Sequence, residues 1–381
     1  MDRDGAAPVL IFRIGSLGDT VVALPVFHEI RRRHPHSRIL LLTNTPVDGG
    51  IRAASTTQVL EGTGLVDEYI EYPHGSLSPV RLLAVIRALR RLGPRRCYFL
   101  MPDRSPAQAW RDRLFFRLAG VRDTVGLDPA GNAMRPPLEP GGLWEAEARR
   151  LMRIVGAGDR ELTPQDFSLH LSEHERSTAA QALNEGGVRG RFVVFCIGTK
   201  HPANDWGDAK WSACLRDFGA IARDHALVAV GSAVEAGRSA GLLLAWPGAT
   251  LNLCGRLLPR QSAAVLERAS LFLGHDSGPT HLACAVRAPV VAVYSGRNRP
   301  GVWFPFGQED NVVRLDVPCM GCALVTCVAH ANRCLTGIEP ARVVQRAARV
   351  LDASREGSPG RPVQFVEPVL RTVRAACGSG S

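Results

Sequence analysis

The amino-acid sequence predicts an α/β protein built from two doubly wound domains that face each other across a cleft. Short, continuously apolar segments alternate with amphipathic ones, as expected of buried parallel strands separated by helices. This alternation begins twice, at residues 9–14 (VLIFRI) and at residues 191–197 (RFVVFCI), and a glycine turn follows each start. Ligands of open parallel sheets bind beyond the carboxyl ends of the strands, so we expect both glycine turns to border the cleft.

In the first half, a turn at residues 15–20 follows the first strand, and an apolar-periodic helix is expected at residues 21–33. The turn lacks the full Gly-x-Gly-x-x-Gly pattern and the spaced acidic partner of a dinucleotide site, so we expect no nicotinamide or flavin there. Further strands are expected at residues 38–43, 95–101 and 124–127, and further helices at residues 78–91, 107–119 and 144–155. A Pro- and Gly-rich loop is expected at residues 128–142.

The second half repeats the alternation. Strands are expected at residues 191–197, 227–230, 251–255, 271–273 and 290–294, and helices at residues 211–225, 262–269, 282–286 and 340–353. We place the domains at residues 1–170 and 186–352, with a connection between residues 166 and 190, followed by a C-terminal segment at residues 353–381.

The most informative stretch is residues 271–281 (LFLGHDSGPTH), a buried strand followed by a polar turn. Asp276 or Ser277 can cap the helix that follows, and N–H groups left free there can hold an anion. Gly278 lets the chain approach a ligand, and His281 lies one turn inside the helix, facing the same crevice. An ordinary cap with a surface histidine fits these residues equally well.

Other polar residues follow predicted strands. Asp19, in the first glycine turn, is a candidate general base that faces the cleft, although a simple helix cap fits it as well. Asp103 and Arg104 follow the strand at residues 95–101. Glu235 lies in the loop or first helical turn after a strand of the second half.

Composition sets limits on the class of protein. The chain has 381 residues, 45% of them apolar, which is enough for two cores, and a formal net charge of +10 that is almost entirely due to arginine. Clusters at residues 31–33, 87–96 and 149–153 favour an anionic partner such as a phosphorylated substrate, a nucleic acid or an acidic lipid surface, although each could be a solvated helix face. We expect no nucleic-acid binding, because the sequence has no recognised motif or interleaved aromatic strip for it.

No segment approaches the roughly 18 apolar residues of a membrane helix, and the N-terminus does not resemble a signal peptide. We therefore expect a cytoplasmic monomer, with peripheral contact to the inner face of the cytoplasmic membrane as a further expectation. The ten cysteines do not form the framework of a secreted disulfide protein. Four of them, Cys319, Cys322, Cys327 and Cys334, have spacings that a structural zinc or iron–sulfur site could use, but free or paired thiols are favoured.

Three segments resemble a known family. Residues 11–19 (IFRIGSLGD), followed by Leu24 and Pro25, resemble the start of the ADP-heptose:lipopolysaccharide heptosyltransferases, glycosyltransferase family 9. Residues 274–283, together with residues 289–294, resemble the second motif of that family, and residues 198–206 (GTKHPANDW) resemble its middle motif. The resemblance extends from about residue 8 to 351.

This resemblance implies a GT-B fold, two Rossmann-like domains with the active site between them, and inverting, metal-independent sugar transfer. The N-terminal domain would bind the acceptor and the C-terminal domain the nucleotide sugar, and residues 363–377 could return to the N-terminal domain. Asp19 would deprotonate the acceptor hydroxyl, and Asp103 and Arg104 would contact the acceptor. The donor-binding candidates are Gly18, Thr199, Lys200, Asn204, Trp206, Glu235, Asp276, Ser277, Gly278, Pro279 and His281.

The middle motif departs from the family pattern at one position. Members commonly have a lysine two residues before the motif tryptophan, but here Asn204 precedes Trp206. The only lysines of the chain are Lys200 and Lys210, so one of them reaches the donor phosphates or the site is weakened. We favour Lys200.

The predicted function is therefore transfer of a heptose or related sugar from an ADP-sugar, or another nucleotide-diphosphate sugar, to a hydroxyl of a lipopolysaccharide-core or other glycan acceptor. No cofactor beyond this donor substrate is expected. Two alternatives remain open: the same fold and chemistry acting on a natural-product or protein acceptor, and a non-catalytic nucleotide- or glycan-binding protein.

Overall fold

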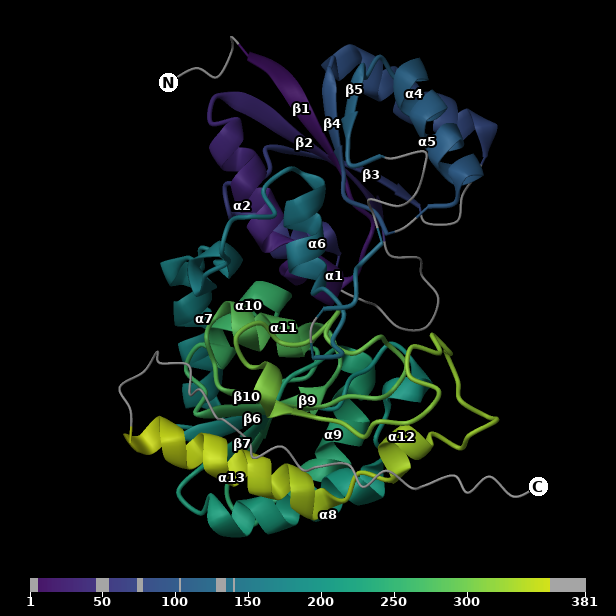
Figure 1. The fold of residues 1–381 in the computed structure, drawn as a ribbon. Helices are drawn as coiled ribbons and strands as arrows, with labels where there is room; N and C mark the ends of the chain where they lie inside the picture. Colours follow the sequence, from purple (N-terminus) through teal and green to yellow (C-terminus); the bar gives the residue numbers. More distant parts are fainter. Residues whose placement is uncertain are drawn as a thin grey trace, which may run out of the picture.

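The computed structural model describes residues 6–45, 55–73, 78–102, 104–127, 135–139 and 141–356. These residues form two sheets with helices between them and on their outer faces (Figure 1). All strand pairs are parallel, in the order β3-β2-β1-β4-β5 in the first sheet and β11-β10-β9-β6-β7-β8 in the second. The predicted class, two doubly wound α/β units, is confirmed.

The strands of the first sheet are β1 (Ala6–Phe12), β2 (Ser37–Thr45), β3 (Glu68–Pro73), β4 (Arg96–Phe99) and β5 (Asp123–Val125). The helices of this half are α1 (Leu17–Val22), α2 (Leu24–Arg33), α3 (Thr56–Leu60), α4 (Pro79–Leu92), α5 (Pro106–Leu118) and α6 (Glu147–Ile154), followed by the 3-10 turn η1 (Pro164–Phe167).

The strands of the second sheet are β6 (Phe192–Cys196), β7 (Ala226–Ala229), β8 (Thr250–Asn252), β9 (Leu271–His275), β10 (Val290–Val293) and β11 (Val312–Val313). The helices are α7 (Glu173–Glu185), α8 (Asp208–Ile221), α9 (Ala236–Leu243), α10 (Pro259–Leu266), α11 (Gly278–Ala285), α12 (Arg333–Thr336) and α13 (Pro340–Glu356), and the 3-10 turns are η2 (Pro202–Asn204), η3 (Ala233–Glu235) and η4 (Glu309–Asn311).

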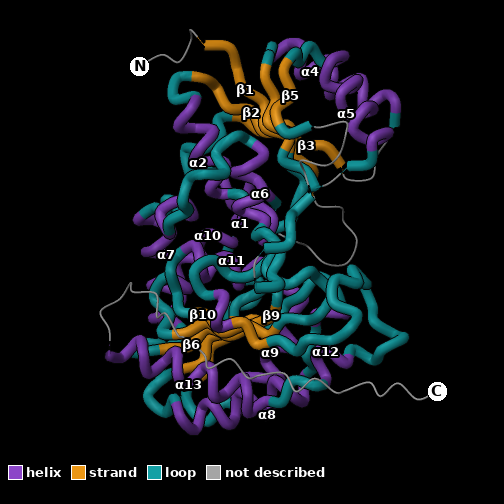
Figure 2. The backbone as a smooth tube through the Cα atoms, viewed as in Figure 1, coloured by secondary structure: helices purple, strands orange, loops and turns teal. Residues whose placement is uncertain are grey.

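One hydrophobic core lies between the two sheets. Val9 and Ile11 on one face of β1 belong to the same cluster of buried residues as Val194 on β6, together with residues of α1, α2, α6, α10 and α11. Figure 2 shows these helices between the strands of the two sheets. Leu10 and Phe12, on the other face of β1, pack in a separate core with α4 and α5. The two halves are therefore joined by apolar packing as well as by the chain.

A strap of backbone hydrogen bonds also connects the two halves. The N–H of Trp144 donates to the carbonyl of Pro300 (2.8 Å), and the N–H of Glu147 donates to that of Val302 (2.9 Å). A Cβ on Gly301, which has a φ of +95°, would lie only 2.5 Å from the carbonyl oxygen of Trp144. Only glycine therefore fits at this crossing of the two segments.

The helix expected at residues 21–33 is two helices. α1 ends at Val22 and α2 begins at Leu24, with Ala23 between them. Pro25 has no N–H to donate to the carbonyl of Val21, so the helical hydrogen bonds are interrupted there. α1 also begins earlier than predicted, at Leu17, and Asp19 is the third residue of a helix instead of part of a turn.

The segment expected to connect the domains contains α7. Ser172 and Glu175 form a capping box at the start of this helix, a sequence pattern that could have predicted it. α7 packs against α10 of the second half. The proposed domain limits at residues 1–170 and 186–352 stay a prediction.

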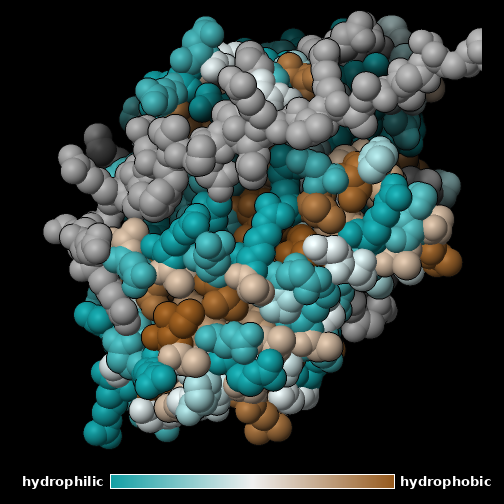
Figure 3. Space-filling view, turned by 60° about the horizontal axis from the view of Figure 1, so that its bottom comes forward, coloured by the Kyte–Doolittle hydropathy of each residue, from teal (hydrophilic) through white to brown (hydrophobic). Residues whose placement is uncertain are grey.

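The helix predicted at residues 340–353 is α13, which packs against α8 and the second sheet. Residues 363–377, which could return to the N-terminal domain, lie outside the described residues. Hydrophilic and hydrophobic side chains are interspersed on the face in Figure 3. Every helix in the described part of the chain is too short or too polar to cross a lipid bilayer.

Candidate active site

The start of α1 and the start of α11 meet between the two sheets. A Cβ on Gly18 would lie 3.3 Å from the Cα of Gly278, and a Cβ on Gly278 would lie 2.8 to 2.9 Å from side-chain atoms of Leu17. Both glycines therefore allow a close approach of the two helices. This contact brings Asp19, on α1, near the polar turn that follows β9.

The Asp19 side chain caps its own helix. Its Oδ2 accepts hydrogen bonds from the backbone N–H and the hydroxyl of Ser16, both at 2.7 Å. The Asp19 carbonyl accepts from the guanidinium of Arg13 (2.9 Å), which is itself buried and paired with Glu147. The capping interpretation of Asp19 is thus correct for one carboxylate oxygen, and the arrangement holds the half-buried carboxylate in a fixed place.

The turn after β9 does not cap α11 as expected. Ser277 is the N-cap residue, but its side chain makes no capping hydrogen bond, and its Oγ is buried without a partner. The Asp276 carboxylate instead accepts from Asn298 (2.7 Å). The unpartnered hydroxyl of Ser277 and the backbone N–H of Gly278 are therefore available to an anion. Pro279 has no N–H, and the N–H of Thr280 already donates to the carbonyl of Ser277 (3.1 Å).

Asp276 lies in a poorly solvated position. Burial raises its pKa to about 6, and the negative charge of Asp19 acts in the same direction. The hydrogen bond from Asn298 and the positive charge of Arg297 oppose this rise. The effect of Asp19 on Asp276 shows that the two carboxylates, from the two halves of the molecule, lie within electrostatic reach of each other.

His281 is also buried close to Asp19. Its side chain is only 5% exposed, and burial lowers its pKa to about 4 while Asp19 opposes the shift. The imidazole is therefore neutral at pH 7. Its ring packs edge-on against Trp303, with 6.4 Å between ring centroids. A neutral imidazole can donate one hydrogen bond and accept another.

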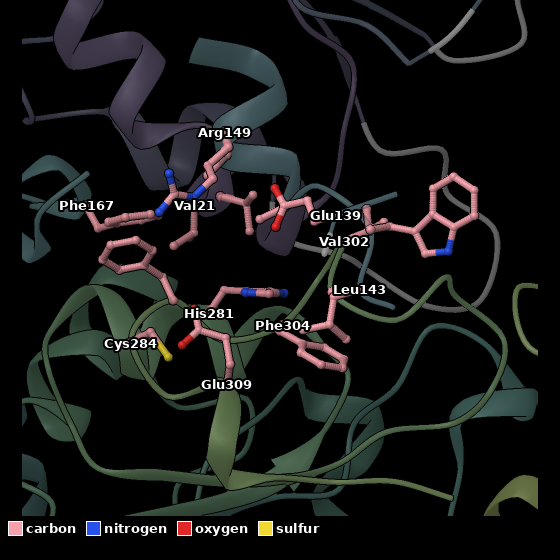
Figure 4. A pocket seen from close by; sticks show the side chains of 16 residues that line it. Val21, Glu139, Leu143, Arg149, Phe167, His281, Cys284, Val302, Phe304 and Glu309 are labelled. Carbon is pink, nitrogen blue, oxygen red and sulfur yellow. The ribbon is translucent and has the colours of Figure 1, made fainter. Parts of the chain in front are cut away.

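A cavity of about 220 Å³ lies between the two halves, beside this polar turn. Figure 4 shows His281 between residues of α1, such as Val21, and the aromatic ring of Phe304. Of the predicted site residues, only His281 lines the cavity. The other lining residues are Val21, Val22, Glu139, Leu143, Trp144, Ala146, Ala148, Arg149, Phe167, Cys284, Gly301, Val302, Phe304, Phe306 and Glu309.

The middle motif is held in place by His275, the last residue of β9. The Nε2 of His275 accepts hydrogen bonds from the backbone N–H of Trp206 (3.0 Å) and from the indole N–H of Trp211 (2.8 Å). Its Nδ1 lies 3.2 Å from the carbonyl oxygen of Ile197, which fixes the tautomer. Burial lowers the pKa of His275 to about 4. His275 is therefore a structural histidine.

Asn204 and Trp206 support the motif from inside the protein. The Asn204 amide donates to the carbonyl of Asp276 (3.3 Å), and its Oδ1 accepts from the hydroxyl of Ser295 (2.6 Å). The Trp206 indole N–H donates to the carbonyl of Ile338 (3.1 Å). Both residues are 4% exposed, and their hydrogen bonds give them a structural role. Their contact with the donor stays a prediction.

The two lysines differ in position. Lys210 is in the first turn of α8, and its Nζ donates to the carbonyls of Thr336 (2.7 Å) and Ile338 (2.6 Å). It is thus used to hold α12 and the start of α13. Lys200 is exposed next to Thr199 and makes no hydrogen bond or ion pair with a described residue. Of the two, Lys200 alone remains a candidate for the donor phosphates.

Glu235 packs against the loop that carries Lys200. A Cβ on Gly198 would lie 2.3 Å from Oε1 of Glu235, and one on Gly231 would lie 2.3 Å from Oε2. The backbone N–H of Ser232 donates to Oε2 (2.6 Å). Glu235 is therefore held at the carboxyl ends of β6 and β7, beside the other donor-binding candidates.

Sequence reasoning missed two residues near Asp276. Asn298 donates to Asp276, and Arg297 lowers the pKa of both Asp276 and His201. Arg297 and Asn298 follow β10, which pairs with β9. The rule that ligands bind beyond the ends of neighbouring parallel strands could have identified both.

The remaining predicted residues lie elsewhere. Asp103 lies outside the described residues. Arg104 forms an ion pair with Asp112 (3.2 Å) and lies 5.9 Å from the centroid of the Phe99 ring, so its charge is partly neutralised. Pro279 is in the first turn of α11, where a backbone N–H would have no acceptor within the helix, so a proline does not interrupt the helical hydrogen bonds.

The four C-terminal cysteines, Cys319, Cys322, Cys327 and Cys334, line one small cavity with His330. They are free thiols in the structure. Across the described ranges, no group of three or more histidine, cysteine or acidic side chains is arranged to hold a metal ion. The two predicted alternatives, free or paired thiols and a structural metal site, both stay predictions.

Two facing parallel α/β units with polar groups gathered between them define the GT-B fold. Solved structures of this fold superpose on nearly the whole chain. They include a family 9 glycosyl transferase from Veillonella parvula DSM 2008, with a TM-score of 0.70 and 18% identity, covering 93% of this chain and 98% of that one. The E. coli ADP-heptose lps heptosyltransferase II superposes with a TM-score of 0.62 and 19% identity, covering 91% and 99%.

The sequence comparisons identify the family. Residues 151–331 match the model of glycosyltransferase family 9 (heptosyltransferase). A stretch of 104 residues is 29% identical to lipooligosaccharide heptosyltransferase 2 of Campylobacter jejuni, covering 27% of this chain. The match spans about a third, 32%, of that relative's length. The chain belongs to glycosyltransferase family 9.

Proposed function

We propose that this protein transfers a heptose, or a closely related sugar, from ADP-heptose or another nucleotide-diphosphate sugar to a hydroxyl group of a lipopolysaccharide-core or other glycan acceptor. The observation that carries the proposal is the meeting of Asp19, on α1, with the turn of Asp276 and Ser277 before α11. A base from one half and an anion-binding turn from the other are the two parts that an inverting transfer needs.

In this mechanism the acceptor hydroxyl attacks the anomeric carbon from the face opposite the leaving group. Asp19 takes the hydroxyl proton through Oδ1, because Oδ2 is occupied by the two hydrogen bonds from Ser16. The new glycosidic C–O bond forms as the bond between the anomeric carbon and the diphosphate oxygen breaks. The electron pair of the broken bond leaves with the nucleoside diphosphate, and the configuration at the anomeric carbon is inverted.

The departing diphosphate gains negative charge, and several groups of the second half can stabilise it. The N–H of Gly278, the dipole of α11 and the unpartnered hydroxyl of Ser277 are placed to stabilise such an anion from one side. Lys200 supplies an ammonium group from the loop after β6, and Arg297 adds positive charge near Asp276. We propose that these groups suffice without a metal ion.

The identity of the sugar and of the acceptor rests on similarity to relatives. One relative carries the name lipooligosaccharide heptosyltransferase, and a solved structure of the same fold is an ADP-heptose enzyme of lipopolysaccharide synthesis. The structure gives no support to loss of catalysis, because Asn204 has a structural role that does not depend on a donor.

The test is to incubate the protein with ADP-heptose and a panel of lipopolysaccharide-core acceptors, and to measure ADP release and the anomeric configuration of the product. We expect acceptor-dependent ADP release and an inverted product. ADP binding without turnover for any acceptor would favour the non-catalytic alternative. A product of retained configuration would exclude the proposed mechanism.

A further inference from the structure

The outer side of α5 carries a row of large apolar side chains that face water. Trp110, Leu114 and Leu118 recur every four residues and so share one side of the helix, and they are 59%, 59% and 46% exposed. Ala109 and Phe116 are buried in the core on the inner side. Since the inner side already fills the core, the outer row is a second apolar surface without a partner in the described chain.

The neighbouring helix α4 extends this surface. Val80 and Leu83 are 75% and 50% exposed, and their spacing places them on the same side as Arg87 and Arg90. The guanidinium of Arg90 donates to the carbonyl of Leu118 at the end of α5 (2.7 Å). Figure 1 shows the two helices packed beside each other on the outer face of the first sheet. We call the exposed sides of both helices the α4–α5 face.

The charge of the α4–α5 face is strongly positive. α4 contains four arginines and no acidic residue, as the sequence PVRLLAVIRALRRL shows. The single acidic residue of α5, Asp112, is paired with Arg104 and Arg111. Arg87 and Arg117 are exposed and pair with no described residue. Guanidinium groups therefore surround the apolar row.

We propose that the α4–α5 face docks on an anionic lipid bilayer. Arginines attract phosphate headgroups, while Trp110 and the leucines enter the boundary between headgroups and acyl chains. A second copy of this chain fits less well, because a symmetric contact would bring the arginines of the two copies together. A nucleic acid would pair with the arginines but leave the apolar row in water.

The position of the α4–α5 face relative to the candidate active site agrees with this partner. β1 and β4 pair with Phe12 opposite Phe99, so the segments after both strands leave the sheet at the same edge. The first of these segments leads to Asp19 and the second to α5. If the proposed function holds, an acceptor anchored in the bilayer would lie at this edge, whereas docking itself does not depend on that function.

The experiment measures flotation of the full chain with vesicles, in the absence of donor and acceptor. One set contains phosphatidylcholine alone and the other a mixture with phosphatidylglycerol. We expect at least tenfold stronger binding to the anionic vesicles, decreasing as salt is raised. The variants Trp110→Ser/Leu114→Ser and Arg87→Glu/Arg91→Glu should each reduce this binding about tenfold or more, since one basic residue near an anionic surface contributes roughly fivefold.

Matched controls lie on the other half of the protein. Leu244, which is 86% exposed, is replaced in Leu244→Ser, and the exposed Arg189 and Arg268 in Arg189→Glu/Arg268→Glu. Both controls should bind vesicles within twofold of the unchanged protein. Thermal unfolding checks that each variant folds. The charge variant changes only exposed side chains, so it keeps the test valid if the serine variant does not fold.

Three results would overturn the proposal. They are equal binding to both kinds of vesicle, no vesicle binding at all, and equal losses in the control and α4–α5 variants. A fourth result would come from sedimentation velocity. If the α4–α5 variants lose a dimer that the unchanged protein forms, and do not lose vesicle binding, the face would be assigned to a second copy. ADP affinity is measured in parallel, so a failure of the proposed function would appear there and leave the vesicle result intact.

Discussion

Gly18 and Gly278 face each other across the boundary between the two halves of the protein, and a Cβ on Gly18 would lie 3.3 Å from the Cα of Gly278. The two helix starts can approach this closely because neither residue has a side chain. The distance between Asp19 and the turn of Asp276 depends on this approach. The glycine pair is therefore as important to the candidate site as the charged groups.

Gly278→Ala should push α1 and α11 apart, because the new Cβ would lie 2.8 to 2.9 Å from Leu17 atoms that include its Cβ. We expect at least a tenfold loss of kcat/KM, since a displacement of about 1 Å between reacting groups can cost about a hundredfold. Gly237→Ala is the control, because a Cβ there meets nothing within 4 Å. Full activity of Gly278→Ala would show that the close contact between α1 and α11 is not needed.

Asp19→Asn should lower kcat by roughly 10²- to 10⁴-fold, the usual contribution of a general base. The amide oxygen of asparagine can still accept the N–H of Ser16, so the fold should be kept. Steady-state ADP release gives kcat, and calorimetry gives the ADP dissociation constant, which we expect to be unchanged. Ser16→Ala removes the hydroxyl that donates to Asp19 but keeps the backbone N–H donor and the carboxylate. A larger loss in Ser16→Ala than in Asp19→Asn would contradict the proposed role.

Lys200→Met should weaken ADP binding, whereas Lys210→Met should lower the stability of the fold. Loss of Lys200 should raise the ADP dissociation constant about tenfold, the value of one charge-assisted hydrogen bond, and leave the unfolding midpoint unchanged. Loss of Lys210 should lower the free energy of unfolding by about 1–2 kcal/mol, because the carbonyl of Thr336 loses its ammonium donor and that of Ile338 keeps only the indole N–H of Trp206. Calorimetry and urea unfolding separate the two. If Lys200→Met binds ADP normally, Lys200 is not the phosphate ligand.

Asp276 should make stability depend on pH. Its pKa is raised from 3.8 to about 6 by burial, so the native protein binds this proton more tightly than the unfolded chain does. The resulting stabilisation is present below pH 4 and is lost as the pH rises through 6, amounting to about 3 kcal/mol at about 1.4 kcal/mol per pKa unit.

The measurement is urea unfolding of the unchanged protein and of Asp276→Asn at several values between pH 4 and pH 7. We expect the stability of the variant, relative to the unchanged protein, to increase with pH by up to about 3 kcal/mol. A difference that stays constant over this range would refute the raised pKa.

His275 should contribute in the opposite direction. Its pKa is lowered to about 4 by burial, so its contribution to stability is present above pH 6.5 and is lost as the pH falls through 4. His275→Ala should cost about 2–5 kcal/mol at pH 7, because two N–H donors, of Trp206 and Trp211, lose their acceptor. His275→Gln, which keeps an acceptor, should cost less. Equal losses in the two variants would argue against this account.

Much of the fold could be predicted from the sequence because its strands are buried on both faces. Strands such as β6 and β9 are continuously apolar, and their buried residues belong to cores on both sides of the sheet. The break at Pro25 was missed because the apolar spacing continues through it. α7 was missed because its apolar face is narrow, although the Ser172 capping box marks its start.

The candidate site was only partly predictable, since its geometry depends on contacts distant in sequence. The turn at Asp276 could be found from its motif and its position after a strand. The roles of Asn204 and Lys210 depend on partners about 70 to 130 residues away, Asp276 and Ile338, which local pattern cannot reveal. The cap on Asp19 was foreseen as one alternative, but the interdomain contact of its helix was not.

The strap formed by Trp144 with Pro300 and by Glu147 with Val302 constrains how the two halves can move. Its peptide groups hold the halves at one side of the interdomain cavity, and sliding one half past the other would break both hydrogen bonds together. A rotation about the strap would leave both intact while separating Gly18 from Gly278. Substrate would then enter by a hinge rotation of one half against the other, and the gap between the halves would be widest at the edge farthest from residue 301.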